Sequence, residues 1–300
     1  MNLRFKRILL TGNNRLTAGI AVCLLHAGHE VTLYDPSGSN LRPVILQDLE
    51  KNEGNFSEGL SIGNYDLVIC ISREHLEEKQ QLISRVERYV GAETPVCINA
   101  ESISLQDISA TASNPERVIG MNWSEPAYTS FFLEMFCTAG TNQELVQAVF
   151  GEAKQHWQKD PYLLKNGRGI RSRMLTALMR EAFFLVENDY VRIEDIDRAC
   201  RNDAGYYLPF AGNFRYMDLM GAYMYGVVMQ DLNPELSKDK HIPEFARKLF
   251  KSGAEGMQNG KGFYEYEEGE AEEWDNKFRK FSHEIKDVIS KYNHETVGEL

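Results

Sequence analysis

A glycine turn and a later carboxylate have the order and spacing of residues that bind a dinucleotide. The apolar segment Arg7–Gly12 ends in a glycine, a helix-like segment follows, and Asp35 closes the next apolar segment, 23 residues after Gly12. The glycine would make the tight turn of such a site. The carboxylate of Asp35 would accept hydrogen bonds from the adenosine ribose and repel a 2′-phosphate, so NAD is expected rather than NADP.

The turn keeps only part of the G-x-G-x-x-G pattern. It reads G-N-N-R-L-T from Gly12 to Thr17, so Asn14 and Thr17 stand where two further glycines would be. Asn14 can adopt left-handed backbone angles, but its side chain would intrude where a phosphate oxygen should lie. Thr17 would reduce the room between helix and strand. A strand–helix turn that binds no ligand therefore remains an alternative.

Strands and helices are expected to alternate through the first half of the chain. The expected strands are Arg7–Gly12, Glu30–Asp35, Tyr65–Ser72, Pro95–Ala100, RVIGMNW and FFLEMFC, and the expected helices include LTAGIAVCLLHAGH and HLEEKQQLISRVERYV. Continuous apolar, β-branched segments separated by helices are typical of a parallel sheet covered on both faces. The pattern predicts a doubly wound α/β, Rossmann-like domain over residues 1–165.

An all-α domain is predicted over residues 166–268. Its expected helices are RSRMLTALMREAFFLVENDYV, IEDIDRACRNDAG (closed by its glycine), YMDLMGAYMYGVVMQDL and IPEFARKLFKSG. Residues 269–300 form a charged tail, predicted as a helix that packs on its own or a neighbouring subunit. The apolar residues expected to line one face of that helix are Trp274, Phe278, Phe281, Ile285 and Ile289.

Composition narrows the classes of function. The net charge of −11 argues against non-specific binding to nucleic acid or to an anionic membrane. The five cysteines form no C-x-x-C pair, so neither a metal site nor a disulfide framework is expected. The first apolar run is too short for a signal peptide, and no run approaches the roughly 20 residues of a membrane span. A cytoplasmic protein is expected.

Six blocks of sequence resemble, in order and spacing, the L-3-hydroxyacyl-CoA dehydrogenase family. They are CINAESI, RVIGMNWSEP, FFLEMF, GRGIRSRML, LPFAGNFRYMDLMG and NGKGFYEY, and together they extend the resemblance over nearly the whole chain to Tyr266. The resemblance implies an NAD-binding Rossmann-like domain followed by a helical domain. It also implies a homodimer formed through the helical domain.

The resemblance assigns several positions to the cofactor side. Asp35 matches the ribose-binding acid, and Glu74 and Lys79 match a Glu/Lys pair near the nicotinamide. Asn99 matches the asparagine of the family's N-T-S block. A family asparagine has become Glu125, which adds a negative charge near the expected cofactor. These matches imply an NAD site, and the change at Glu125 leaves weakened or lost NAD binding as an alternative.

The catalytic positions depart from the family pattern. The family serine that holds the substrate oxygen falls on Glu101, the proton-exchanging histidine on Asn122 and the assisting asparagine on Ser172, whereas the acid that orients the histidine is retained as Glu134. Ser102 could slide into the role of the serine. An amide cannot accept the proton of a secondary alcohol, and losing a general base typically costs a factor of about 10²–10⁴. Direct proton transfer to Glu134 is an alternative, if burial raised its pKa.

The basic arm that helps the family bind coenzyme A is also reduced. Only about thirty residues separate Asp35 from Asp66, and the basic residues between them are Arg42 and Lys51, against four acids. A ligand with several phosphates would find little to bind there.

Two functions follow as hypotheses. The first is a catalytically impaired or silent family member that serves as a nucleotide-sensing or structural protein. The second is a working NAD-dependent oxidoreductase that acts on a 3-hydroxyacyl-CoA or on another hydroxy acid. In that case Arg168, Arg171 and Arg173 could bind a carboxylate of the substrate.

Overall fold

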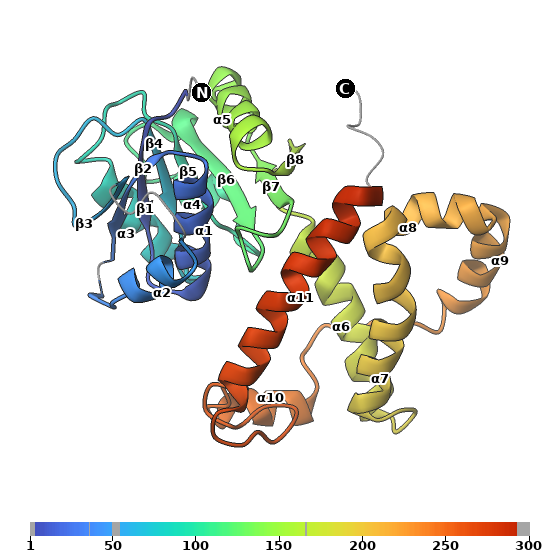
Figure 1. Cartoon of the computed structure of the whole chain (residues 1–300). Coiled ribbons are helices and arrows are strands. Elements are labelled where there is room, and N and C mark those ends of the chain that lie inside the picture. The colour runs from blue at the N-terminus through green and yellow to red at the C-terminus, as the bar shows by residue number, and fades with distance from the viewer. Residues whose placement is uncertain (1–3, 36, 50–54, 166, 293–300) are drawn as a thin grey trace. The chain divides into compact units, whose positions relative to one another are not determined.

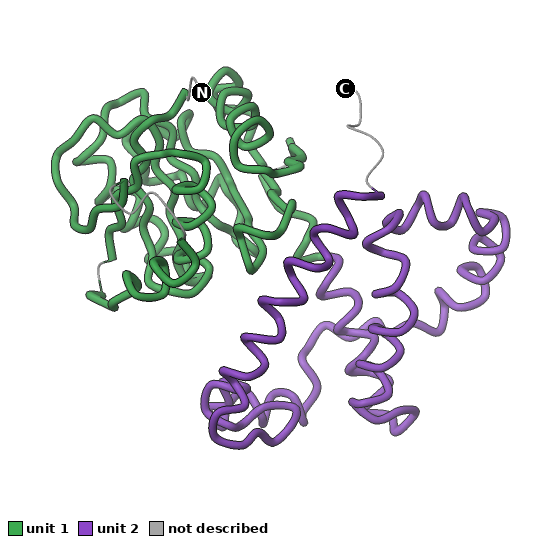
Figure 2. The backbone as a smooth tube through the Cα atoms, in the orientation of Figure 1, with its two compact units in different colours: residues 1–173 green, residues 174–300 purple. Residues whose placement is uncertain are grey.

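The structure is a computed structural model that describes residues 4–35, 37–49, 55–165 and 167–292. The chain forms two compact units, Met1–Arg173 and Met174–Leu300, which Figure 2 shows in different colours. The first unit is α/β and the second is helical, as the sequence predicts. The sequence also predicts a finer division, into domains over residues 1–165 and 166–268 and a tail over residues 269–300. This division stays a prediction.

An eight-stranded sheet forms the first unit, in the order β3-β2-β1-β4-β5-β6-β7-β8. Its strands are β1 (Arg7–Thr11), β2 (Glu30–Tyr34), β3 (Phe56–Glu58), β4 (Leu67–Cys70), β5 (Val96–Ile98), β6 (Val118–Trp123), β7 (Phe132–Phe136) and β8 (Asp160–Leu164). The chain adds β2 and β3 on one side of β1 and β4 on the other. Ligands of open α/β sheets bind at such a reversal, beyond the carboxyl ends of the strands.

The predicted parallel sheet is correct for every described strand pair except β6–β7, which is antiparallel. Only residues 124–131 connect these two strands. A parallel crossover needs a dozen or more residues, so this short connection forces the chain to turn back. Strands β3 and β8 are not predicted from the sequence, because β3 has only three residues and β8 begins beside a proline.

Alternation of side chains along β1 explains the two cores of this unit. Ile8 and Leu10 point to one face of the sheet and Leu9 to the other. The first face is covered by α1 (Arg15–His26), α2 (Arg42–Gln47) and α5 (Gln143–His156), and the second by α3 (Leu76–Val86) and α4 (Leu105–Ser109). Asp35, Glu74 and Asn99 follow the carboxyl ends of β2, β4 and β5.

Helices make up the second unit, and two predicted boundaries in it are wrong. The elements are α6 (Arg171–Glu187), α7 (Ile193–Ala199), a π-helical turn (Cys200–Ala204), α8 (Gly205–Met220), α9 (Ala222–Leu232), α10 (Glu244–Lys251) and α11 (Glu270–Tyr292). Gly205 does not end a helix, because its φ of −62° is helical and the chain continues into α8. Gly221 breaks the segment predicted as one helix, since its φ of 106° lies outside the helical region.

The helical unit buries few apolar side chains. Among its described residues, Ala246 is the one apolar side chain that is buried. Trp274, Phe278 and Phe281, on the predicted apolar face of α11, are exposed. No helix in the described part of the chain is both long and apolar enough to cross a membrane.

Candidate functional site

The turn after β1 is built around Gly12, which has a φ of +147°. A Cβ there would lie 2.3 Å from the Thr17 hydroxyl, so this position requires glycine. Asn14 is extended (φ −122°, ψ 175°) rather than left-handed, and its side chain caps α1. Its Oδ1 accepts from the backbone N–H of Thr17 at 3.0 Å and from the Thr17 hydroxyl at 2.8 Å. A first-turn donor that could bind an anion is therefore already occupied.

Asp35 lies directly after β2 and is held by its own loop. Its Oδ1 accepts from the backbone N–H and the hydroxyl of Ser37 at 2.8 and 2.7 Å, and its Oδ2 accepts from the Ser39 hydroxyl. Although partial burial opposes them, these hydrogen bonds lower the pKa of Asp35. The ribose hydroxyls of a dinucleotide would have to replace the two serines as donors to this carboxylate.

Glu74, Lys79 and Asn99 lock together the loops that follow β4 and β5. Oε1 of Glu74 accepts three consecutive backbone N–H groups, those of residues 101–103, over 2.7–3.1 Å. The fully buried ammonium of Lys79 lies 3.3 Å from Glu74 and donates to the Asn99 carbonyl at 2.7 Å. The Asn99 amide in turn bonds both backbone groups of Ser72. All three side chains therefore stabilise the backbone of the loops after β4 and β5.

Asn122, the residue that the resemblance aligns with the family's histidine, is buried. Its Oδ1 accepts from the Ala100 N–H and its Nδ2 donates to the Ala100 carbonyl, both at 2.9 Å. Nδ2 also donates to Oε2 of Glu134 at 3.0 Å. The amide thus ties β6 to the loop after β5, with both polar atoms engaged.

Glu134 is completely buried and accepts hydrogen bonds on both oxygens. Its Oε1 accepts from the Tyr162 hydroxyl at 2.8 Å and from the backbone N–H groups of Ile170 and Arg171 at 2.7 and 3.1 Å. The last two groups belong to the beginning of α6, where a negative charge is favourable. Burial, followed by the hydrogen bond and charge of Glu134, raises the pKa of Tyr162. Glu134 therefore anchors the start of the long helix.

Glu101 bonds to the same end of α6. Its Oε1 lies 3.3 Å from the guanidinium of Arg171, and its Oε2 accepts from the Ser172 hydroxyl. The structure therefore brings together Glu101, Asn122, Glu134 and Ser172, four of the five predicted catalytic-side positions. Arg171 pairs with Glu101, so its guanidinium is shared with an internal carboxylate.

Ser102 points away from this cluster. Its hydroxyl donates to Glu74 at 3.2 Å, and its carbonyl accepts from Arg168 at 3.2 Å. The alternative in which Ser102 replaces the family serine is therefore not favoured by this geometry. Arg173 is exposed on α6.

The reduced basic arm is α2 and the loop after it. Arg42 lies at the first position of α2, 3.4 Å from the Glu58 carboxylate, and stacks over the Phe56 ring at 5.3 Å. Lys51 lies outside the described residues. The positive charge at Arg42 is therefore offset by an acid on β3.

Gly169 and Tyr162 also contact this site, although neither is predicted from the sequence. A Cβ on Gly169 would lie 2.0 Å from the Glu134 carboxylate and 3.0 Å from the Asn122 amide, so only glycine can close over this pair. Tyr162 reaches Glu134 from the neighbouring strand β8. Its signal in the sequence is a glycine between Arg168 and Ile170 just before α6, a residue type that permits a close approach.

The carboxyl edge of the sheet fits NAD at the ribose and only partly at the pyrophosphate. Asp35 would hold the ribose hydroxyls, and the turn from Gly12 to Thr17 would face the pyrophosphate. At the pyrophosphate, the Asn14 side chain already occupies the backbone N–H of Thr17 that a phosphate oxygen would use. Glu125 adds a negative charge there, which Arg15 at 3.8 Å partly offsets. Within the described residues, no cluster of three or more His, Cys, Asp or Glu side chains could hold a metal ion.

Comparison with known proteins places these features in one family. The model of the 3-hydroxyacyl-CoA dehydrogenase NAD binding domain matches residues 52–166, and that of the 3-hydroxyacyl-CoA dehydrogenase C-terminal domain matches residues 170–266. The chain belongs to the 3-hydroxyacyl-CoA dehydrogenase family, an NAD-dependent family of oxidoreductases, as the sequence blocks predict.

Relatives with different names match the chain over most of its length. A Bacillus subtilis protein named Probable 3-hydroxybutyryl-CoA dehydrogenase is 25% identical over 89% of this chain and 99% of its own. A Mesorhizobium japonicum protein named 5-formyl-3-hydroxy-2-methylpyridine 4-carboxylate 5-dehydrogenase is 26% identical over 87% of this chain and 91% of its own.

Solved structures share the fold. A 3-hydroxyacyl-CoA dehydrogenase from Archaeoglobus fulgidus has a TM-score of 0.67 and 26% identity, and covers 92% of this chain and 97% of its own. The structure of a 5-formyl-3-hydroxy-2-methylpyridine 4-carboxylic acid 5-dehydrogenase has a TM-score of 0.88, with 21% identity, and covers 95% of this chain and 98% of its own.

Proposed function

We propose that this chain is a catalytically impaired member of the family, whose former proton-transfer site has become a structural hydrogen-bond network. The observation that carries this proposal is the state of Asn122. It stands at the histidine position, is buried, and engages both polar atoms of its amide with Ala100 and Glu134. An amide cannot take up the proton that leaves a substrate hydroxyl at neutral pH.

The neighbouring carboxylates are poor substitutes for the missing base. Glu134 is fully buried, and four hydrogen-bond donors already engage its two oxygens. Glu101 is partly exposed, but its two oxygens are engaged by Arg171 and Ser172. Either group would have to give up these bonds before it could accept a proton from a substrate.

Binding of NAD is proposed to be retained in a weakened form. Asp35 supports it, because a carboxylate in this position after β2 matches the ribose of NAD. The Asn14 cap and Glu125 weaken it, because the first occupies a donor at the start of α1 and the second adds negative charge. We expect NADH to bind in the range between micromolar and millimolar.

A second candidate is an active NAD-dependent oxidoreductase whose substrate carries a carboxylate. The relative from Mesorhizobium japonicum favours it, because that protein's name includes a 4-carboxylate. Arg171 is the residue of this chain that would hold such a group, in exchange for Glu101. This candidate still lacks a group at position 122 that can accept a proton.

A cytoplasmic location is proposed as well. Cys23, Cys70, Cys97 and Cys137 are buried as free thiols, and reducing compartments maintain that state.

Restoration of the family residues tests the proposal. NAD reduction with 3-hydroxybutyryl-CoA should be compared in the wild type, in Asn122→His and in the triple variant Glu101→Ser, Asn122→His, Ser172→Asn. We expect little gain from the single change and a gain of at least tenfold from the triple change, with unfolding temperatures measured to confirm folding. A wild type that turns over as fast as a folded triple variant would overturn the proposal.

A further inference from the structure

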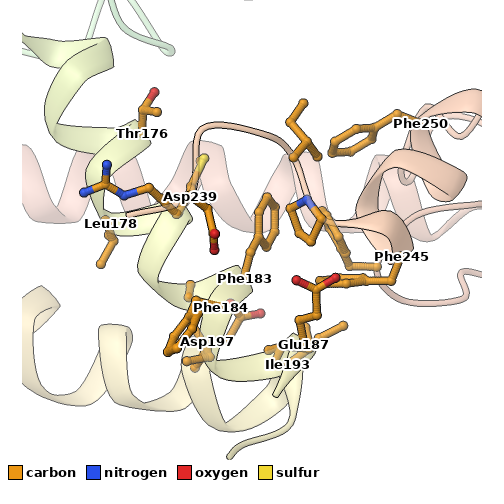
Figure 3. A pocket seen from close by; sticks show the side chains of 18 of the residues that line it. Thr176, Leu178, Phe183, Phe184, Glu187, Ile193, Asp197, Asp239, Phe245 and Phe250 are labelled. Atoms are coloured by element: carbon orange, nitrogen blue, oxygen red, sulfur yellow. The ribbon is translucent and has the colours of Figure 1, made fainter. Parts of the chain in front are cut away.

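The phosphates of a dinucleotide need cations or N–H donors, and the large cavity of the helical unit is poorly suited to them. This cavity has a volume of about 780 Å³. Aromatic side chains such as Phe183 and Phe245 surround its interior (Figure 3), and the acids that line it, Glu187, Asp197 and Asp239, outnumber its lysine and arginine side chains. Desolvation of a pyrophosphate among apolar rings and acids is unfavourable. A pyrophosphate is therefore expected at the turn after β1, in the first unit.

A guanidinium lies at the start of α1, within that turn. Arg15 is the first residue of the helix and follows Asn14, the residue at the position of the second glycine. Its side chain is 45% exposed, and its Nε lies 3.8 Å from Oε2 of Glu125. The first turn of α1 contains no acid that would balance this charge, and a positive charge at this end of a helix is unfavourable by itself. The start of α1 therefore favours an anion, which Glu125 supplies from another part of the chain.

The connection between β6 and β7 places Glu125 beside the start of α1 and is itself held in place. The buried ammonium of Lys159 donates to the carbonyls of Ala127 and Ser130 in this connection. The connection also lies against α1, since a Cβ on Gly19 would be 3.2 Å from the backbone nitrogen of Ala127. The fold therefore fixes the backbone that carries Glu125 next to the helix that carries Arg15.

The ion pair between Arg15 and Glu125 is of the kind that a phosphate can replace. Both side chains are more than a third exposed, and ion pairs of such exposure contribute little to stability. A guanidinium forms two parallel hydrogen bonds with a phosphate, and a pyrophosphate offers more negative charge than one carboxylate. The exchange would also supply a donor at the turn, where the backbone N–H of Thr17 is already bonded to Asn14.

We propose that Arg15 binds the pyrophosphate of NAD and that Glu125 pairs with Arg15 while the cofactor is absent. This inference rests on the retained binding of NAD proposed above. The G-x-G-x-x-G pattern assigns the pyrophosphate to backbone groups and small residues, whereas this chain uses an arginine side chain in their place. Glu125 is an internal competitor, because binding of NAD must separate it from Arg15.

Titration of NADH fluorescence in full-length variants tests both roles. Arg15→Gln should bind NADH roughly tenfold more weakly than wild type, because a charge-assisted hydrogen bond to phosphate is lost. Arg15→Lys keeps the positive charge and should recover part of that loss. Glu125→Gln should bind NADH about threefold more tightly, because no ion pair has to be broken. The titrations are made at low ionic strength, where charges are little screened.

Lys6→Gln is the matched control. Lys6 is an exposed cation paired with Glu30 at 3.0 Å, and both residues lie at the amino ends of β1 and β2, on the opposite edge of the sheet. The substitution changes the net charge by the same amount as Arg15→Gln and should leave the NADH affinity within about twofold of wild type. Unfolding temperatures of all variants confirm that they are folded.

ADP-ribose distinguishes the pyrophosphate from the nicotinamide as the group that Arg15 binds. It contains the pyrophosphate and lacks the nicotinamide, so Arg15→Gln should weaken its binding by the same factor as that of NADH. Equal NADH affinity in wild type and Arg15→Gln would overturn the inference, and so would an ADP-ribose affinity that Arg15→Gln leaves unchanged. A Glu125→Gln protein that binds NADH no more tightly than wild type would overturn the role of Glu125. If neither wild type nor Glu125→Gln bound NADH at millimolar concentration, the retained binding of NAD and this inference would both fall.

Discussion

Asn122 and Glu134 face each other across the antiparallel pair β6–β7, and Nδ2 of Asn122 donates to Oε2 of Glu134 over 3.0 Å. The resemblance to the family places a histidine at the first position and its orienting acid at the second. In this chain the acid retains a partner, but the partner is an amide that also holds Ala100. The pair now joins β6, β7 and the start of α6.

The first prediction concerns Asn122→Asp. This change replaces a donor with a second carboxylate beside Glu134 in a buried position. Two donated hydrogen bonds are lost and two negative charges oppose each other. We expect the free energy of unfolding to fall by about 3–5 kcal/mol at pH 8, measured by urea titration. The loss should be smaller at pH 5, where one proton can be shared.

The matched control is the double variant Asn122→Asp, Glu134→Gln, which restores a donor opposite the new carboxylate. It should recover at least half of the lost stability. An Asn122→Asp protein that unfolds within 1 kcal/mol of wild type at pH 8 would show that the pair does not support the structure.

The second prediction concerns Gly169→Ala. Its Cβ would lie 2.0 Å from Glu134, so the backbone before α6 must shift. We expect a loss of about 1–3 kcal/mol in the free energy of unfolding. Gly151→Ala in α5 is the control, because a Cβ there meets no atom within 4 Å. That change should raise stability by about 0.5–1 kcal/mol, and equal effects of the two changes would contradict the close approach at Gly169.

The third prediction concerns His29, which is fully buried in the first unit. Its Nδ1 lies 2.6 Å from the Phe5 carbonyl, and its Nε2 accepts from the Trp157 indole N–H at 2.8 Å, which requires the neutral ring. Burial lowers the pKa of His29 from 6.5 to about 4. The unfolded chain therefore binds the proton first, and this part of the stability is complete above pH 6.5 and lost as the pH falls towards 4.

The expected loss attributable to His29 over that range is on the order of 3 kcal/mol. His29→Gln keeps a donor and an acceptor but does not titrate, so its unfolding free energy should fall less between pH 6.5 and 4. Burial raises the pKa of nearby Glu152, which acts in the opposite direction in both proteins. If the unfolding free energies of wild type and variant fell equally between pH 6.5 and 4, His29 would be excluded as the cause of the loss.

The fourth prediction concerns the turn at Asn14. Asn14→Gly frees the backbone N–H of Thr17 and costs the cap only a few tenths of a kcal/mol. NADH should bind roughly tenfold more tightly, because one more donor reaches the pyrophosphate. Fluorescence titration measures this, with Asp35→Ala as the variant expected to lose binding. Unchanged affinity in Asn14→Gly would show that the cap does not limit the cofactor.

The order of elements could be predicted because it depends on local patterns. Buried strands such as Leu67–Cys70 are continuous apolar runs, and Asp35 follows its strand directly. Helix ends in the second unit were less predictable, because glycine ends a helix only where the backbone leaves helical angles. Gly221 does so and Gly205 does not.

The site could be predicted as a set of positions but not as a network. Asn122 binds the backbone of Ala100, 22 residues away, and every residue type except proline would offer those two groups at position 100. The residue types in the sequence therefore cannot reveal such a contact by themselves. Asn14 illustrates the same limit, since its side chain turned out to cap α1 from an extended backbone.

The rate of NAD reduction by the purified wild type with saturating 3-hydroxybutyryl-CoA tests the central claim most directly. Typical enzymes turn over at about 1–10³ s⁻¹, and loss of the base alone lowers the rate by about 10²–10⁴. We predict a kcat below about 0.1 s⁻¹, with NADH still bound in a parallel titration. A kcat in the ordinary range would contradict the account, because Asn122 and its network would then not prevent the family's reaction.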